Sequence, residues 1–515
     1  MKLKKQKDWF KLKRYPHIDR PFHHRDRSKW LESYITDPAC IQKHAFLPFI
    51  HKISKSRKFR KTYCKKTGKL ISTEIDGKEV FRSASDPKAR EIFYASHLDS
   101  LVFGYYSQKL TAKYESKLKA NGLDQVVTAY RSIPVKEGDL EGPNKCNIDF
   151  ANDVFKFIHD YPEDKFVAIT FDITSFFDHL DHQMLRDSWM SLLDTKKLPP
   201  DHFNIYKNIT RFSYVDLIDI FQEFQNRIIT QSRDSSGKLL PEKRKRVSKI
   251  KYLKNQDAIA FCTKQEFIKV KSRLIRNRKY VPGKEKEIRN YGIPQGSPIS
   301  SVLANIYMQD FDKAINDYVS DLNGIYRRYS DDMVVVCPRE QKESVIDLFQ
   351  SKIKELKLTI KASKTQIFHF KRENRTLTCG QEFEELINWN KNFIYLGFEF
   401  DGETVLLKSG SLSNYYRKMK RTVKRAKHHA SRKTNPNKDE IFKGRILKKF
   451  SYKGAKRRRK YLWDEEIEGF KKSEHYDWGN FISYSTKAGE TLMNNKIKEQ
   501  TKRHWNKLNA LMKKT

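Results

Sequence analysis

The stretch "RRYSDDMVVV", Arg327–Val336, decides the fold because two adjacent aspartates stand at the entrance of an apolar strand. Met333 to Val336 is a continuous apolar run, which predicts a strand that packs on both faces of a sheet. Asp331 and Asp332 come directly before this run. An ionised carboxylate avoids such a place unless a positive charge meets it. The stretch therefore raises the question of which cation binds here.

A second acidic position, Asp172, indicates which cation binds here. "FVAITF", Phe166–Phe171, predicts another buried strand, and Asp172 stands at its end in "ITFDITSFFDHLDH". Two strand-end carboxylate sites on one sheet can share a divalent ion, and Mg²⁺ prefers such hard oxygen ligands together with substrate phosphates. Two ions about 3.5–4 Å apart would activate a 3′-hydroxyl and stabilise the pyrophosphate that leaves in an in-line displacement. We therefore expect two Mg²⁺ ions and a triphosphate at these aspartates.

Each acidic position has a simpler interpretation when it is taken alone. Asp331 and Asp332 could form a solvated hairpin turn, and Asp172 could be a strand-end turn residue or a helix N-cap. The order along the chain favours the metal site. A strand-end aspartate comes first, the turn "YGIPQGSPIS" opens an apolar helix downstream, and the tyrosine-serine-aspartate-aspartate motif follows.

The composition agrees with a folded protein that binds a polyanion. The chain has 515 residues, enough for two to four structural units, with 38% hydrophobic and 13% aromatic residues. Its formal net charge of +41 indicates nucleic acid as the partner, and a generally basic soluble protein is the alternative. Six separated cysteines without a CxxC pair, and no stretch long enough to span a bilayer, predict no zinc site, no disulfides and a cytoplasmic location.

Local patterns outline the remaining chain. The basic and aromatic N-terminal region includes an expected hairpin turn at Asp76–Gly77. Ser83 to Leu123 reads as helical, and "NFIYLGFEFDGETVLL" reads as strands with a turn at Asp401–Gly402. After about Ser411 we expect basic helices.

These motifs resemble those of the reverse transcriptases, especially the bacterial lineage that includes group II intron proteins, retron enzymes and defence-associated enzymes. "FDITSFFD" is similar to motif A, "GIPQGSPISSVLANIYM" to motif B and "YSDD" to motif C. "LKLTIKASKTQIF" resembles motif D, and "FIYLGFEF" resembles the primer-grip motif E. The order and spacing hold across about 230 residues, so the match is specific.

The resemblance implies a role for each matching residue. Asp172, Asp331 and Asp332 would be catalytic and would hold two Mg²⁺ ions, with the backbone carbonyl of Ile173 as a further ligand. Phe177 would lie under the sugar, where a ring selects deoxynucleotides by excluding a 2′-hydroxyl, although it could also be a core aromatic. The other implied nucleotide-binding residues are Arg131, Lys145, Pro294, Gln295, Gly296 and Lys364, and the implied primer grip is Tyr395, Leu396 and Gly397.

Several of these residues also have plain structural interpretations. Pro294 to Gly296 could be a helix-starting turn, although glycine there would let the backbone approach a substrate closely. Lys364, which resembles a lysine able to protonate pyrophosphate, could be solvated. Tyr395 to Gly397 could form an ordinary β-hairpin.

The implied fold is α+β, the right-hand polymerase fold with fingers, an antiparallel-sheet palm and a helical thumb. Its expected divisions are a basic N-terminal extension at residues 1–80, fingers at 81–165, a palm with an inserted fingers segment at 166–410, and a basic helical thumb at 411–515. We find no nuclease, integrase or zinc-knuckle signature, which favours a stand-alone enzyme.

The expected activity is RNA-directed DNA synthesis by a nucleotidyltransferase that makes cDNA from dNTPs, with a noncoding RNA template and a role in antiviral defence. One alternative is an untemplated or protein-primed DNA polymerase of the abortive-infection type. Another is a non-catalytic RNA-binding module, which would not require three aspartates in a basic groove. A viral-type RNA-dependent RNA polymerase is disfavoured by the bulky Phe177.

Overall fold

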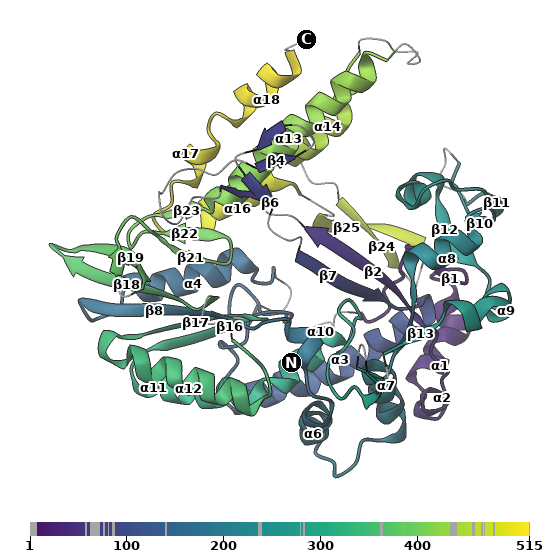
Figure 1. The fold of residues 1–515 in the computed structure, drawn as a ribbon, viewed down its shortest axis with the longest axis horizontal. Helices are drawn as coiled ribbons and strands as arrows, with labels where there is room; N and C mark the ends of the chain where they lie inside the picture. The colour runs from purple at the N-terminus through teal and green to yellow at the C-terminus, as the bar shows by residue number, and fades with distance from the viewer. Residues whose placement is uncertain are drawn as a thin grey trace. The chain divides into compact units, whose positions relative to one another are not determined.

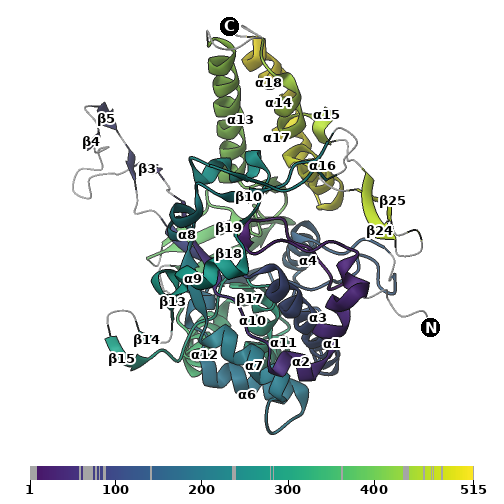
Figure 2. The same cartoon turned by 90° about the vertical axis from the view of Figure 1, so that its right-hand side faces the viewer.

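The chain folds into two compact units, each described here by itself. In the computed structural model, unit 1 comprises residues 118–174 and 309–513, and unit 2 comprises residues 8–117 and 175–308. The structure describes residues 8–56, 59–61, 73–75, 78–80, 82–84, 88–139, 142–234, 239–278, 280–281, 284–360, 364–384, 386–432, 440–455, 459–464, 467, 469–476 and 479–513. Figures 1 and 2 show the labelled elements in two views.

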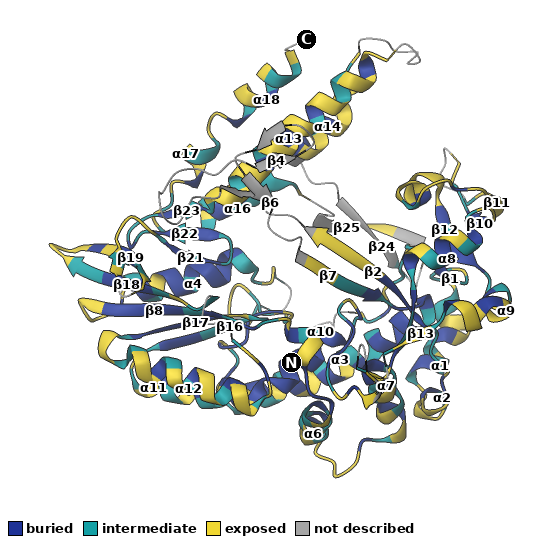
Figure 3. Ribbon diagram, in the orientation of Figure 1, coloured by how far each residue is buried: buried dark blue, intermediate teal, exposed yellow. Residues whose placement is uncertain are grey.

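Unit 1 is built on an antiparallel six-stranded sheet in the order β16-β17-β8-β18-β19-β20. Its strands are β8 (Lys165–Asp172), β16 (Ile325–Tyr329), β17 (Asp332–Pro338), β18 (Gln366–Glu373), β19 (Thr376–Phe383) and β20 (Leu386–Asn388). Because β8 and β17 lie inside the sheet, their apolar runs are buried, as Figure 3 shows. The expected strands at Phe166–Phe171 and at Met333–Val336 are confirmed.

The two faces of this sheet pack against different elements. Phe166 and Ala168 belong to a core with α4 (Asn147–His159) and the strands β21 to β23. On the other face, the ring of Phe171 stacks on Phe349 of α12 (Lys342–Glu355), with ring centroids 4.0 Å apart. Helix α11 (Gln309–Asp321) lies beside α12 (Figure 1). Successive side chains of β8 thus enter both cores, which explains why its sequence is apolar without alternation.

A small antiparallel sheet connects the large sheet to the C-terminal helices. It comprises β21 (Phe393–Tyr395), β22 (Phe398–Phe400) and β23 (Val405–Leu407). The expected turn at Asp401–Gly402 is confirmed, because the Asp401 carboxylate accepts hydrogen bonds from the backbone N–H groups of Glu403 and Thr404. Gly402 has φ +112°, a conformation that favours glycine.

The C-terminal region is helical and basic, as expected, with one exception. Its elements are α13 (Ser409–Ala430), α14 (Lys443–Phe450), α15 (Tyr452–Ala455), α16 (Phe481–Thr491), α17 (Ile497–Thr501) and α18 (His504–Lys513). Helix α13 buries Tyr415, Met419 and Val423 on one face and exposes its arginines and lysines on the other. Contrary to a wholly helical expectation, β24 (Arg459–Asp464) and β25 (Gly469–Tyr476) form a hairpin. Tyrosine and tryptophan in β24 favour a strand over a helix.

The described residues of unit 2 contain helices, two four-stranded sheets and the two-stranded pairs β3-β6, β4-β5 and β14-β15. One sheet has the order β13-β9-β2-β7 and the other has the order β1-β12-β10-β11. Its strands and helices of at least four residues are β2 (Phe49–Ser56), β7 (Lys88–Tyr94), β9 (Ser213–Asp216), β12 (Ala258–Cys262), β15 (Lys284–Ile288), α1 (Glu32–Thr36), α2 (Pro38–Gln42), α3 (His97–Ala120), α5 (Phe176–His179), α6 (His182–Leu193), α7 (Pro200–Thr210), α8 (Leu217–Phe224), α9 (Lys264–Leu274) and α10 (Ser300–Tyr307). Shorter strands are β1 (His17–Ile18), β3 (Phe59–Lys61), β4 (Thr73–Ile75), β5 (Lys78–Val80), β6 (Arg82–Ala84), β10 (Ile228–Thr230), β11 (Lys243–Lys245), β13 (Arg276–Asn277) and β14 (Tyr280–Val281).

Two predictions for the N-terminal region have different outcomes. β4 and β5 pair antiparallel on either side of the expected turn. The turn residues, Asp76 and Gly77, lie outside the described residues. The expected helix at Ser83–Leu123 is wrong before His97, because β7 pairs along its length with β2. Among the described residues, no helix is long and apolar enough to cross a membrane.

Candidate active site

The strand register of unit 1 places Asp172 and Asp332 directly opposite each other. β8 and β17 pair antiparallel, with Asp332 opposite Asp172 and Met333 opposite Phe171. Asp332 is the first residue of β17 and Asp172 is the last of β8, so both aspartates stand at the same end of these two paired strands. Like charges at directly opposed positions repel each other, which means that this arrangement is stable only with compensating positive charge.

Asp331 joins this pair through the turn between β16 and β17. Tyr329 pairs with Asp332, which leaves Ser330 and Asp331 to form the turn. Ser330 adopts a positive φ of +64°, and the Asp331 carbonyl accepts a 3.3 Å hydrogen bond from the backbone N–H of Ile173. The three predicted carboxylate residues therefore lie on two neighbouring chain segments that are joined by backbone hydrogen bonds.

A buried ion pair lies under the turn. The guanidinium of Arg328 donates from Nε and Nη2 to the two carboxylate oxygens of Asp312 on α11, at 2.7 and 2.6 Å. Both side chains have 0% exposure. Nη1 of Arg328 also donates to the carbonyl oxygen of Ser330 at 3.3 Å, and Tyr326 donates its hydroxyl to Asp312 at 2.9 Å. The sheet, the helix and the turn are thus connected through one arginine.

Two lysines supply the positive charge near the aspartates. Nζ of Lys364 donates to Oδ1 of Asp172 at 2.5 Å, with both side chains about one-third exposed. The pKa of Asp332 is raised to about 6 by the loss of hydration and by the charges of Asp331 and Asp172, against the effects of Lys408 and Lys364. The Asp332 residue is nevertheless exposed to solvent, so the neighbouring carboxylates are the stronger physical cause.

The donor set suits a hard divalent cation, although the side chains are not gathered around one point. Asp172, Asp331 and Asp332 offer carboxylate oxygens, the ligands that Mg²⁺ prefers. Within the part of the chain that the structure describes, no group of three or more acidic, histidine or cysteine side chains has the geometry of a metal site. Asp172 is bound to Lys364 instead. A metal ion would therefore have to compete with this ammonium group for Asp172.

The predicted primer-grip residues form a tight hairpin turn next to these carboxylates. Leu396 and Gly397 both have positive φ, +43° and +95°, between β21 and β22. Nδ2 of Asn147 donates to the Leu396 carbonyl at 3.1 Å. The hydroxyl of Tyr395 is buried without a hydrogen-bond partner among the described residues, and burial together with the Asp332 charge raises the pKa of Tyr395. The hairpin is thus confirmed, while its contact with a primer stays a prediction.

Arg131 and Lys145, predicted to grip a triphosphate, both contact protein groups. Nη1 of Arg131 donates to the carbonyl oxygens of Asp124 and Val127, at 2.5 and 2.6 Å. Nζ of Lys145 lies 2.8 Å from Oδ2 of Asp153 on α4. These contacts give both residues a structural role, and their binding of a nucleotide stays a prediction.

The remaining predicted residues belong to unit 2. Phe176 is 3% exposed whereas the neighbouring Phe177 is half-buried, so Phe177 is the ring with accessible surface. The backbone carbonyl of Gln295 accepts a 2.8 Å hydrogen bond from the backbone N–H of Phe93. Gly296 has φ +114°, and a Cβ there would lie 2.7 Å from the Phe93 carbonyl oxygen. The close approach of Gly296 to β7 therefore explains why a glycine is needed at this position, independently of any substrate.

The sequence interpretation did not single out the residues that support the site. They are Arg328 and Asp312 under the turn, Lys408 near Asp332, and Asn147 at the hairpin. A signal was present for Asp312, which lies three residues before Ile315 and seven before Val319 and so shares their buried helix face. Lys408 and Asn147 carry no comparable local signal.

Comparison with a protein-family model identifies the domain. Residues 255–400 match the model described as "Reverse transcriptase (RNA-dependent DNA polymerase)". The matched segment contains Asp331, Asp332, Lys364 and the hairpin of β21 and β22, while Asp172 precedes it. Residues 255–400 therefore form a segment that matches a reverse transcriptase domain.

Three solved telomerase structures from Candida tropicalis are similar to this chain at a low level. Apo telomerase truncated from its C-terminal domain has 9% identity and a TM-score of 0.35, over 74% of this chain and 59% of that one. Apo telomerase has 11% identity and a TM-score of 0.35, over 78% and 56%. Telomerase in complex with a TWJ fragment of telomeric RNA has 11% identity and a TM-score of 0.31, over 78% and 53%.

The chain thus spans between 53% and 59% of the length of these telomerase chains. No curated protein matches the sequence.

Proposed function

We propose that the protein is a reverse transcriptase that makes cDNA from dNTPs on an RNA template, by nucleotidyl transfer that depends on two Mg²⁺ ions. The observation that carries the proposal is the register that sets Asp332 opposite Asp172, with Asp331 in the adjoining turn. Two of these three carboxylates lie within the segment that matches reverse transcriptases. Opposed carboxylates repel each other and here depend on Lys364 and Lys408 for compensating charge, so a catalytic need is the simplest reason for their presence.

Asp172, Asp331 and Asp332 would hold the ions, with the carbonyl of Ile173 as a further ligand. When bound, the ions would lower the pKa of a primer 3′-hydroxyl and neutralise charge on the departing pyrophosphate. Lys364 would donate a proton to that pyrophosphate once it is released from Asp172. The strand register supports this assignment, because it sets Asp332 opposite Asp172 with Asp331 in the adjoining turn.

Other residues would bind the nucleotide and the primer. We propose that Phe177 excludes a 2′-hydroxyl, a role that its partly accessible ring allows. Arg131, Lys145, Pro294, Gln295 and Gly296 would complete the nucleotide site. Tyr395, Leu396 and Gly397 would support the primer end, since their hairpin is fixed by Asn147 close to Asp332.

The right-hand polymerase architecture is part of the same proposal. Residues 81–165 would form the fingers, 166–410 the palm with an inserted fingers segment, and 411–515 the thumb, after a basic extension at 1–80. The antiparallel sheet beneath the aspartates supports the palm. The exposed arginines and lysines of α13 support a thumb that contacts the phosphates of an RNA–DNA hybrid without reading its sequence.

The biological setting rests on the sequence motifs alone. We propose that the enzyme belongs to the bacterial lineage, copies a dedicated noncoding RNA, and serves antiviral defence. We further propose a cytoplasmic location, in keeping with the five described cysteines, which are free thiols. Sequencing the nucleic acid that copurifies with the protein tests this part: an RNA together with its complementary DNA is expected, and homopolymer DNA alone would contradict it.

The catalytic proposal is tested by primer extension. The full chain is given a DNA primer on an RNA template with dNTPs and Mg²⁺, and Asp332→Asn is expected to abolish incorporation while hybrid binding remains. Asp347→Asn is the matched control, because Asp347 is an exposed acid on α12 outside the site. Incorporation by Asp332→Asn at more than about a tenth of the parental rate contradicts the metal assignment. Product whose sequence does not depend on the template contradicts templated synthesis.

A further inference from the structure

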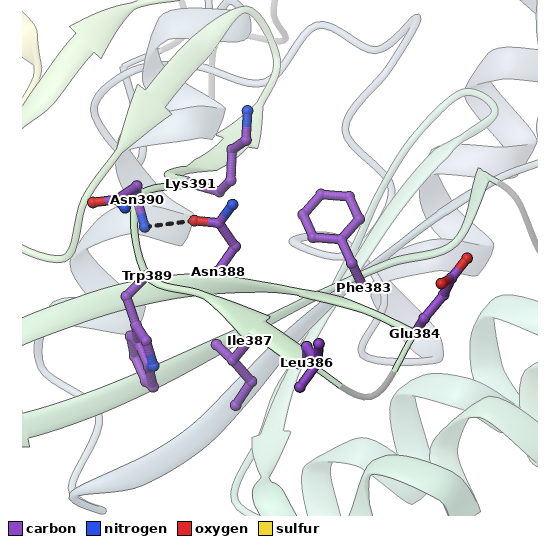
Figure 4. A pocket seen from close by; sticks show the side chains of 8 residues that line it. All are labelled: Phe383, Glu384, Leu386, Ile387, Asn388, Trp389, Asn390 and Lys391. Carbon is purple, nitrogen blue, oxygen red and sulfur yellow. Dashed lines mark hydrogen bonds between the residues drawn. The ribbon is translucent and has the colours of Figure 1, made fainter. Parts of the chain in front are cut away.

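The outer edge of the large sheet in unit 1 carries an exposed apolar surface. β20 is the last strand of the sheet and, among the described strands, pairs with β19 alone. Around it, Phe383, Leu386 and Trp389 are 48%, 77% and 45% exposed. We call the segment Gln381–Lys391 the edge hairpin; Figure 4 shows most of its side chains.

This surface is a built feature and not a loose tail. A Cβ on Gly380 of β19 would lie 2.7 Å from Cγ2 of Ile387 and 2.9 Å from Cε3 of Trp389, so both side chains fold back onto the sheet at this glycine. The backbone N–H of Asn390 donates to Oδ1 of Asn388 at 3.0 Å (Figure 4). Ile387 and Trp389 therefore pack against β19, beside a hollow of about 810 Å³.

The edge hairpin is acidic on a strongly basic protein. Gln381–Lys391 contains three glutamates and one lysine, a net charge of −2, whereas the whole chain carries +41. Glu382 is already occupied, since it binds Nε2 of His369 at 2.5 Å and Nζ of Lys342 at 3.2 Å. Glu384 contacts no cation among the described residues and is therefore available to a partner.

These features exclude several kinds of ligand. A nucleic acid would be repelled by the glutamates. A small molecule needs walls on several sides to bury most of its surface, and this hollow is lined by a single hairpin. A second copy that paired through the same edge would set two segments of equal negative charge, −2 each, against each other.

An extended peptide fits the exposed apolar surface, the negative charge and the outer edge of β20. Leu386, Ile387 and Asn388 form a strand without lysine or proline, the residues that usually protect an exposed edge from pairing. A strand added there would gain backbone hydrogen bonds from β20, and its alternate side chains would reach the apolar surface. We propose that the edge hairpin docks a partner protein through an extended segment in which basic residues alternate with apolar ones.

The proposal is tested with a defined probe, a fluorescein-labelled nine-residue peptide of alternating valine and lysine with blocked ends. Fluorescence polarisation with the full-length protein should give a saturable Kd below about 1 mM. Within Leu386–Asn388, amide hydrogen exchange should slow on binding where the N–H group points away from β19, because only those groups become newly paired.

Variants separate docking from general charge effects. Leu386→Lys and Glu384→Lys should each weaken binding by about tenfold or more, while hybrid binding by the full chain stays unchanged. Ile218→Lys is the matched control, since Ile218 is also exposed, at 59%, and lies in unit 2. A peptide with glutamate in place of lysine, and one with proline in place of valine, should not bind.

Several outcomes overturn the proposal. Absence of peptide binding up to about 1 mM does so, as does equal binding by Leu386→Lys and the parent. Sedimentation that shows a parent oligomer which Leu386→Lys dissociates would assign the surface to a second copy. Tighter binding of the peptide with glutamate than of the peptide with lysine would refute the charge argument.

Discussion

Breaking the buried ion pair of Arg328 and Asp312 should destabilise the protein and disturb the turn that carries Asp331. Both side chains are fully buried, and the two hydrogen bonds between them measure 2.7 and 2.6 Å. In Asp312→Asn the guanidinium charge stays buried without its counter-charge, which costs about 3–5 kcal/mol of folding free energy. Urea unfolding followed by circular dichroism measures this loss. The matched control is Asp317→Asn, because the pair of Asp317 and Lys313 lies on the same helix but is half exposed and should contribute less than about 1 kcal/mol.

A double variant then separates stability from positioning. Replacing both partners by apolar residues, Arg328→Met with Asp312→Leu, removes both buried charges and should restore most of the lost stability. It also removes the hydrogen bond from Arg328 to the Ser330 carbonyl, which holds the turn that carries Asp331. We expect this variant to fold but to add nucleotides at least about tenfold more slowly, a barrier increase of about 1.4 kcal/mol. A double variant that is both stable and fully active would refute the positioning role, and a loss below about 1 kcal/mol in Asp312→Asn would refute the energetic argument.

Three further predictions concern the site residues. Lys364→Met should lower the Mg²⁺ concentration needed for half-maximal extension, because the ammonium group no longer competes for Asp172. It should also slow extension at saturating Mg²⁺, because the pyrophosphate loses its proton donor. An unchanged Mg²⁺ dependence would contradict the competition. Phe177→Ala should admit ribonucleotides, whereas the control Phe176→Ala should lose about 3–5 kcal/mol of stability with unchanged sugar preference; the reverse result would mean that Phe176 is the selecting ring. The pKa of Asp332 is raised from 3.8 to about 6, so its ionisation destabilises the folded protein as pH rises through that range. In metal-free buffer, Asp332→Asn should therefore raise the Tm at about pH 7.5 but not at about pH 4. An equal shift of the Tm at both pH values would exclude the charge effect.

The sequence predicts the centre of unit 1 well because burial on two faces leaves a distinctive pattern. β8 and β17 are short apolar runs that end in aspartates, and strand length and register then bring those aspartates together. The turns at Leu396–Gly397 and Asp401–Gly402 are also local, since glycine at positive φ specifies them within a few residues.

Where the prediction was wrong, long-range pairing decided the structure. The predicted helix extends back to Ser83 from the spacing that begins at His97, yet β7 satisfies its backbone by pairing with β2, some 40 residues earlier in the chain. The support for the site was missed for a related reason. Arg328 looks like one of many basic residues in a chain with 104 lysines and arginines, and only tertiary packing distinguishes a fully buried arginine from the solvated majority.

The cation that meets the aspartates in this structure is an ammonium group. Lys364 binds Asp172 and Lys408 lies near enough to lower the pKa of Asp332, so the repulsion between opposed carboxylates is compensated from within the chain. If the proposed function is correct, this compensation has a mechanistic consequence. A divalent ion can reach Asp172 only by displacing Lys364, and the displaced ammonium is then free to reach a triphosphate that arrives with the ion. Metal binding and the supply of a proton donor would thus be one coupled event, which is why Lys364→Met is expected to improve the first and impair the second.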